Sequence, residues 1–245
     1  MVFWDCNMSY GIDTSKNPQP SSCLNIGALK KQMRQTGVTG GWIFMAFNEV
    51  TRANEMLAED IKDEPNLYGI IKLLPPSTGE TPSPKELPSW MKKHKFAAAI
   101  FSPRNQRFMM RKISVGDYLE EFQTRKIPVV FNTNRGVNLD DVANIMEDFP
   151  ALTAILTYAN CWPSDRELRP FVEKYPNLHL DMSYMLTDDG LHEYPAGRIL
   201  FGSAYPESYM GAHMMVIKHA NISEEAKNLI AGGNLLRIME EAVYD

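Results

Sequence analysis

Short apolar segments alternate with longer amphipathic segments along this chain. The apolar segments are too short to be helices and predict buried β-strands, whereas the amphipathic segments carry apolar residues at helical spacing. This alternation is typical of a parallel sheet with crossover helices. The predicted strands cover residues 2–6, 41–47, 67–74, 96–101, 127–132, 152–157, 178–182 and 199–201. The predicted helices cover residues 24–36, 48–63, 86–93, 117–125, 139–149, 164–174, 207–219 and 223–242.

The number of predicted strands and the chain length decide between two α/β architectures. Eight strands over 245 residues favour a (β/α)8 TIM barrel, as a single domain that covers residues 1–245. The alternative is an open, doubly wound sheet. The segment 183–197, before the last strand, is too short and broken to predict a full helix. The Pro-rich segment 75–88 is interpreted as a loop, because strand and helix patterns resume on both sides of it.

Charge and cysteine usage narrow the class of partner. The formal net charge of −5 argues against general nucleic-acid binding and against an anionic membrane surface. No apolar run approaches the ~20 residues of a membrane-spanning helix. Three widely spaced cysteines (Cys6, Cys23 and Cys161) predict free thiols in a reducing compartment. We therefore expect a cytoplasmic protein whose partner is a small molecule, with no nucleic acid and no membrane involved.

Functional side chains of a TIM barrel lie at the C-terminal ends of its strands. In this sequence those ends carry mostly amides and hydroxyls, which suit a small polar ligand. Two carboxylates, Asp5 and Asp181, are the candidates for acid–base catalysis. Arg104 follows the fourth strand in a basic loop and is of the type that holds carboxylate or phosphate. The predicted ligand-binding residues are Asn7, Ser9, Arg104, Asn132, Tyr158, Asn160, His192, Ser203 and Tyr205.

The histidines do not predict a metal centre. A catalytic zinc site usually needs three protein ligands, and the sequence has neither His-x-His nor His-Glu-x-x-His. His179 falls inside the seventh strand, so it is expected to lie deeper than a ligand at the barrel mouth. His192, in the loop before the last strand, is the one histidine expected near the mouth.

Six segments together carry a resemblance to a known family. They are residues 5–11 (DCNMSYG), 128–133 (PVVFNT), 155–160 (ILTYAN), 177–183 (NLHLDMS), 202–206 (GSAYP) and 230–237 (IAGGNLLR). In order and spacing they resemble the motifs of the amidohydrolase-2 branch of the metal-dependent hydrolases related to amidohydrolases. The resemblance implies a TIM barrel, a metal-assisted hydrolase or a nonoxidative decarboxylase of carboxylated rings, and a homodimer as one assembly.

The family's metal ligands are replaced at every position that this resemblance assigns to them. Those positions hold Asn7, Ser9, Asn132, Tyr158 and Ala204. An amide oxygen is a weak zinc ligand, and a tyrosine is protonated at neutral pH. We therefore expect a barrel with a polar pocket and no metal cofactor; the alternative is zinc held by displaced ligands.

Three functional hypotheses remain open from the sequence. The first is a pseudoenzyme, a degenerate family member that binds a small polar or anionic ligand at the C-terminal mouth. The alternative without a ligand is that the same residues only fill the former metal cavity with a hydrogen-bond network. The second is a metal-independent enzyme that uses Asp5 and Asp181 as acid and base, or Cys161 as nucleophile. The third is an active hydrolase or decarboxylase with displaced ligands such as Asp5, His192 and Asp181.

Overall fold

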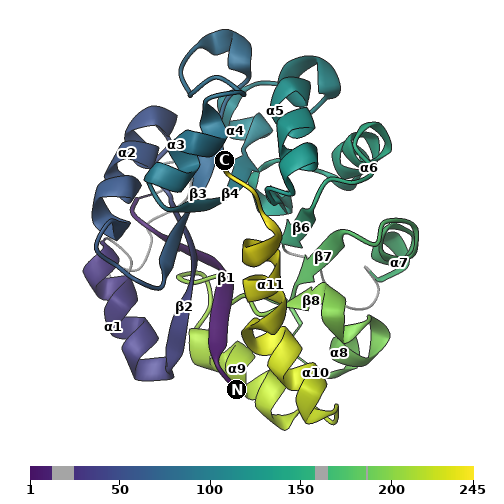
Figure 1. Cartoon of the computed structure of the whole chain (residues 1–245). Helices are drawn as coiled ribbons and strands as arrows, with labels where there is room; N and C mark the ends of the chain where they lie inside the picture. The colour runs from purple at the N-terminus through teal and green to yellow at the C-terminus, as the bar shows by residue number, and fades with distance from the viewer. Residues whose placement is uncertain (13–24, 158–164, 186) are drawn as a thin grey trace.

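All eight predicted strands are present, and each pairs in parallel with the next strand in sequence. The computed structural model describes residues 1–12, 25–157, 165–185 and 187–245. Figure 1 shows the strands side by side in the order in which they follow one another in the chain. They are β1 (Phe3–Tyr10), β2 (Val38–Met45), β3 (Leu67–Leu73), β4 (Phe96–Phe101), β5 (Val129–Asn132), β6 (Ala154–Thr157), β7 (Leu178–Asp181) and β8 (Ile199–Leu200).

The first and last strands close the sheet into a barrel. The Cys6 amide donates to the Phe201 carbonyl at 2.9 Å, and the Ser9 amide donates to the Tyr205 carbonyl at 2.8 Å. An isolated parallel bridge between Met8 and Tyr205 continues this seam beyond β8. The predicted (β/α)8 TIM barrel is therefore confirmed, and the open doubly wound sheet is wrong.

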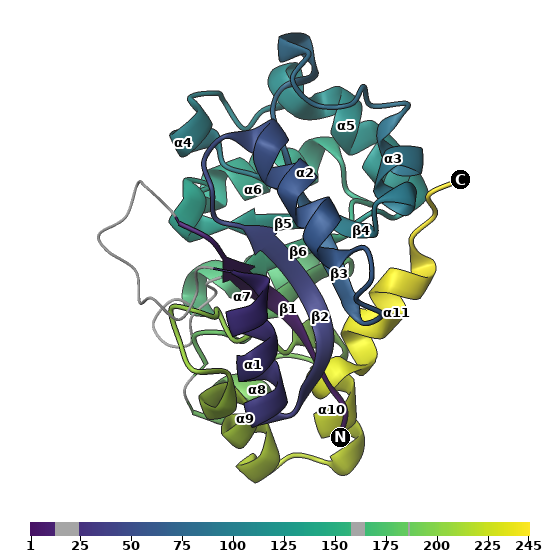
Figure 2. The same ribbon diagram turned by 90° about the vertical axis from the view of Figure 1, so that its left-hand side faces the viewer.

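Helices surround the barrel on its outer side (Figures 1 and 2). Apolar residues on the outer side of the strands pack against the helices in one cluster, and the barrel interior is a second cluster that includes Trp42, Ile70 and Ile155. The helices are α1 (Ile26–Thr36), α2 (Val50–Ile61), α3 (Leu87–Lys93), α4 (Pro103–Gln106), α5 (Lys112–Arg125), α6 (Leu139–Asp148), α7 (Asp165–Lys174), α8 (Asp189–Glu193), α9 (Met210–His219), α10 (Glu224–Asn228) and α11 (Asn234–Glu241). None of them, in the described part of the chain, is long and apolar enough to cross a membrane.

The end of the chain differs from its prediction as one helix over residues 223–242. A π-helical turn, Leu229–Gly233, separates α10 from α11. The Ile230 carbonyl accepts the Phe201 amide at 2.9 Å, so this turn is tied to the strand that closes the barrel. Side chains from α11 join the interior cluster, and Figure 1 shows α11 lying across one end of the barrel. The segment 230–237, one of the six that carry the family resemblance, therefore helps to hold the barrel together.

The first strand is longer than predicted. The sequence placed its end at residue 6, whereas β1 runs from Phe3 to Tyr10. Its pairing with β2 shifts register between Asp5 and Met8, so one irregularity lies within a continuous strand. As a result Asn7 and Ser9 lie inside β1 rather than in a loop after it. Ser9 pairs with Phe44 of β2, whereas Asn7 falls at the irregularity, where its amide donates to Asp5 Oδ1.

Candidate functional site

A buried hydrogen-bond network surrounds Asp181 at the end of β7. The Ser183 amide donates to Asp181 Oδ1 at 2.9 Å, and the Ser183 hydroxyl donates to both carboxylate oxygens. Asn7 reaches over from β1 and donates its Nδ2 to Asp181 Oδ2 at 2.8 Å. His213, buried on α9, contacts the Ser183 carbonyl through Nε2. Both oxygens of Asp181 are therefore engaged by neighbouring side chains.

Asp5 lies next to this network and is also fully buried. Its Oδ1 accepts the Asn7 amide at 2.9 Å and the Ser203 amide at 3.1 Å. Its Oδ2 is buried and has no hydrogen-bond partner among the described residues. Burial raises the pKa of Asp5 to about 7, and the nearby charge of Asp181 acts in the same direction. Burial also raises the pKa of Asp181.

The turn after β8 brings its backbone against these carboxyl groups. A Cβ atom on Gly202 would lie 1.9 Å from Asp181 Oδ1, so only glycine permits this approach. The next residues hold the turn, since Ser203 Oγ accepts the Tyr205 amide at 3.2 Å and Ser9 Oγ donates to the Tyr205 carbonyl at 3.3 Å. Ala204 has a φ of 52° and no polar side-chain atom.

Unsatisfied polar atoms mark the neighbouring strands β5 and β6. Asn132 and Thr157 are register partners at the ends of these strands, and both are buried. Asn132 Oδ1 accepts the Asn134 amide at 3.0 Å. Asn132 Nδ2 and Thr157 Oγ1 have no partner within the described ranges. Buried polar groups nearly always have a hydrogen-bond partner, which makes these two atoms candidate contacts for a ligand or water.

Two buried cations at the mouth were missed in the sequence. Arg135 follows β5, and its guanidinium lies 4.4 Å from the ring centroid of Phe44 on β2, so it reaches across the mouth. Lys72 on β3 donates its Nζ to the Phe47 carbonyl at 2.6 Å. Both cations line a cavity of about 10 Å³ that also touches Gln106. The signal for Lys72 was a lone charge within an apolar strand.

The remaining predicted residues lie apart from this cluster or outside the described residues. His192 is on α8 with about 45% of its side chain exposed, and its Nε2 lies 3.5 Å from Asp188 Oδ2. Arg104 is exposed on α4 and packs close to Gly136. Tyr158, Asn160 and Cys161 fall within 158–164, outside the described residues. The structure thus brings together Asp5, Asn7, Ser9, Asp181, Ser203 and Tyr205, whereas Asn132 contacts Asn134 and pairs with Thr157 on the neighbouring strands.

Among the residues that the structure describes, the donors at the mouth do not fit a divalent metal. In the described part of the chain no three His, Cys, Asp or Glu side chains gather closely enough to hold one. Asn7 directs its Nδ2, which cannot coordinate a cation, at Asp181, and Ala204 offers no side-chain donor. His179 is buried inside β7, where burial and the charges of Arg198 and Arg237 lower its pKa to about 3.

Comparisons with known proteins agree on the fold. A decarboxylase of 2,6-dihydroxybenzoate from Rhizobium superposes with a TM-score of 0.74, at 15% identity over 98% of both chains. The chain has the fold of this enzyme. A dihydroxybenzoic acid decarboxylase from Polaromonas, with bound manganese and the inhibitor 2-nitroresorcinol, gives 0.71 at 16% identity over 98% of this chain and 97% of that one. An uncharacterised TIM-barrel protein from Bordetella bronchiseptica gives 0.71 at 17% identity over 98% and 99%. No family model and no curated protein sequence matches.

Proposed function

We propose that the C-terminal mouth of this barrel binds a small anionic ligand without a divalent metal. The observation that carries the proposal is the pair of buried groups on β5 and β6 that have no hydrogen-bond partner among the described residues. Asn132 Nδ2 is a hydrogen-bond donor, and the Thr157 hydroxyl can donate as well. An amide and a hydroxyl from neighbouring strands present two donors to the oxygens of one carboxylate or phosphate.

The buried cations favour a negative charge on that ligand. Arg135 and Lys72 place a guanidinium and an ammonium group at the mouth, where screening by water is weaker than at the surface. The pKa of about 7 at Asp5 reduces the opposing negative charge below neutral pH. A cavity of about 10 Å³ holds about one water molecule, so a larger anion requires the Arg135 side chain to move from Phe44.

The chemistry of the described residues supports the second half of the proposal, which is binding without a divalent metal. The Polaromonas neighbour binds manganese and a nitrated aromatic inhibitor, on the same fold. The positions at which the sequence resemblance predicts metal ligands include Asn7, Asn132 and Ala204, which offer no anionic donor for a divalent ion. Mass spectrometry of protein purified without chelators is expected to find less than about 0.1 equivalent of zinc or manganese. One equivalent of either would contradict the proposal.

Binding itself is tested by calorimetric titration with acetate, benzoate and phosphate. We expect at least one of these to bind, and Arg135→Gln to weaken that binding about tenfold or more, because a charge-assisted hydrogen bond is lost. The matched control is Arg52→Gln, which removes an exposed arginine on α2. Equal losses in both variants would attribute binding to general surface charge and contradict a site at the mouth.

Acid–base catalysis by Asp5 and Asp181 is the second candidate, and the raised pKa of Asp5 favours it. A carboxyl group with a pKa of about 7 can exchange a proton at neutral pH. Incubation with 2,6-dihydroxybenzoate, the compound named for the Rhizobium neighbour, tests this candidate. Decarboxylation that disappears in Asp5→Asn and persists with EDTA would establish it. No turnover by the wild type from pH 5 to 9 would remove it for this substrate class.

Zinc bound by displaced ligands receives no support from the geometry. That hypothesis required Asp5, Asp181 and His192 to converge. The two carboxyl groups are buried near each other, whereas the His192 imidazole lies on exposed α8 beside Asp188. Metal content, measured as above, is the test that this hypothesis shares with the proposed function.

A further inference from the structure

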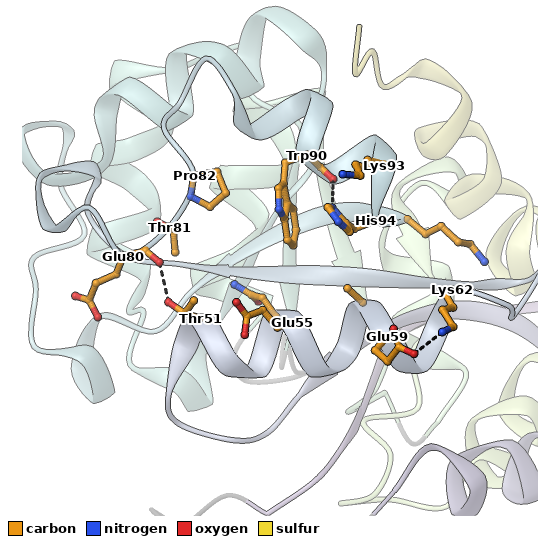
Figure 3. A pocket seen from close by; sticks show the side chains of 13 residues that line it. Thr51, Glu55, Glu59, Lys62, Glu80, Thr81, Pro82, Trp90, Lys93 and His94 are labelled. Atoms are coloured by element: carbon orange, nitrogen blue, oxygen red, sulfur yellow. Dashed lines mark hydrogen bonds and ion pairs between the residues drawn. The ribbon is translucent and has the colours of Figure 1, made fainter.

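A second cavity lies outside the barrel, between α2 and α3 (Figure 3). Its volume is about 600 Å³, within the range of small-molecule sites. Helix α2 forms one wall, and Trp90 of α3 projects into the cavity from the opposite wall. Thr81 and Pro82, in the loop after β3, border one end. This cavity shares no lining residue with the cavity at the mouth.

The indole of Trp90 is held in a fixed position. Its ring centroid lies 4.2 Å from that of His94 and 5.1 Å from that of Phe96. His94 Nδ1 also contacts the Trp90 carbonyl at 2.9 Å, which locks the two rings together. Figure 3 places Thr81 and Pro82 on the side of the indole away from His94. That side presents an aromatic surface to the cavity.

Negative charge gathers at the same end. Glu55 on α2 and Glu80 in the loop after β3 line the cavity, and neither forms an ion pair with any residue that the structure describes. The face of an aromatic ring attracts cations through the ring's quadrupole, and nearby carboxylates add to this attraction. Ala58 and Pro82 supply apolar surface to the same cavity.

The cations at the opposite end are largely engaged by the protein itself. Lys62 pairs with Glu59 one turn earlier on α2. Lys95 donates to the carbonyls of Ile61 and Glu64 and so caps the end of α2. Lys93 is the cation at this end that has no ion pair among the described residues. The two ends of the cavity therefore carry opposite charge. The negative end, with Glu55 and Glu80, is the one next to the indole face that is turned away from His94.

From this arrangement we infer that the α2–α3 cavity binds an organic ammonium ion. The charged nitrogen lies between Trp90 and the carboxylate of Glu55, its alkyl groups contact Pro82 and Ala58, and Glu80 adds negative charge at the rim of the same cavity. Choline is a suitable probe, because its neutral isostere, 3,3-dimethylbutan-1-ol, has the same shape without the charge. The readout is the indole N–H signal of Trp90 in a two-dimensional NMR spectrum, assigned by its loss in Trp90→Phe.

Choline is expected to shift this signal with millimolar affinity, and the neutral alcohol to bind at least about fivefold more weakly, as a cation–π contact of typical strength implies. The double variant Glu55→Gln, Glu80→Gln is expected to weaken choline binding about tenfold. Lys93→Gln, at the opposite end of the cavity, is expected to leave the affinity within about twofold. All three positions are exposed, so the variants are expected to fold.

Three outcomes would overturn the inference. Equal affinity for choline and the neutral alcohol would mean that only an apolar slot is present. An unchanged affinity in the double glutamine variant would exclude the carboxylates. A shift of the Trp90 signal by benzoate rather than by choline would reverse the sign of the ligand.

Discussion

Asp181 Oδ1 occupies the space into which a side chain on Gly202 would extend, at 1.9 Å from an ideal Cβ. This contact joins the end of β7 to the turn after β8, and it keeps Asp181 beside Asn7 and Ser183. The site network and the closure of the barrel therefore depend on the same small residue.

Gly202→Ala is expected to destabilise the fold by about 3 kcal/mol, because the new methyl group must displace the Asp181 carboxylate or the turn. Urea unfolding measures the change. Gly197→Ala is the matched control, since a Cβ there meets no heavy atom within 4 Å. If both variants were equally stable, the crowding at Asp181 would not exist in solution.

Asp5→Asn is expected to change how stability depends on pH. The pKa of Asp5 is about 7 in the folded state and 3.8 in the unfolded chain, so the folded state binds this proton more tightly. Asp5 thus contributes stability that is fully present below about pH 4 and is lost as the pH rises through 7, roughly 4 kcal/mol in total. The stability of the variant minus that of the wild type should grow with pH over this window.

The stability of Asp5→Asn must be compared with that of the wild type at each pH, because His179 also makes the wild-type stability depend on pH. Its pKa of about 3 lies below the ordinary 6.5, so its contribution is present above pH 6.5 and is lost as the pH falls towards 3. The two groups act in opposite directions between pH 4 and 6.5, and the wild-type curve alone cannot separate them. Asp117→Asn, an exposed carboxyl group on α5, controls for the loss of one charge. A difference curve for Asp5→Asn that does not vary with pH would refute the assignment.

Thr157→Val is expected to leave the stability of the ligand-free protein unchanged or to raise it by up to about 1 kcal/mol. The reason is that valine has the same shape and removes a buried hydroxyl that has no partner in the described part of the chain. The same change should weaken binding of the anion. Thr81→Val is the comparison, because the buried Thr81 hydroxyl lies 2.9 Å from the Tyr118 hydroxyl, and its loss should cost about 1–2 kcal/mol. Equal destabilisation in the two variants would show that Thr157 is already satisfied.

Asn234→Ala is expected to lower the free energy of unfolding by about 3 kcal/mol. Its Nδ2 donates to the carbonyls of Ala196 and Ile199 at 2.7 and 2.8 Å, and it is buried where α11 meets the start of β8. Asn228→Ala removes an exposed contact to the Glu224 carbonyl and should cost less than about 0.5 kcal/mol. Thermal unfolding of both variants measures the difference. Similar melting temperatures would argue against a stabilising role for the two Asn234 hydrogen bonds.

The fold followed from the sequence because each apolar run overlaps a strand and each amphipathic run overlaps at least one helix. The predicted ends of strands and helices were wrong where contacts between distant parts of the chain decide them. Pairing with β2 extends β1 to Tyr10, and the Phe201 amide bonds to the Ile230 carbonyl within a π-helical turn. Neither contact leaves a local signal in the chain.

Several of the predicted site residues contact one another in the structure, and the reason is geometric. Asp181 is the last residue of β7, where barrel architecture directs attention, whereas Asp5 and Asn7 were chosen because the sequence placed the end of the first strand at residue 6. Arg135 was missed because its contact with Phe44 spans the mouth from β5 to β2, which sequence distance does not reveal. His192 followed from loop position alone, and the short helix α8 carries it to the surface.

One measurement tests the central claim most directly, namely titration of an anion into the protein before and after removal of divalent metals. Benzoate or phosphate, monitored by calorimetry with and without EDTA, should give the same affinity in both conditions, and Arg135→Gln should weaken it about tenfold or more. Binding that disappears with EDTA and returns with zinc or manganese would contradict the account, and so would binding that Arg135→Gln leaves unchanged.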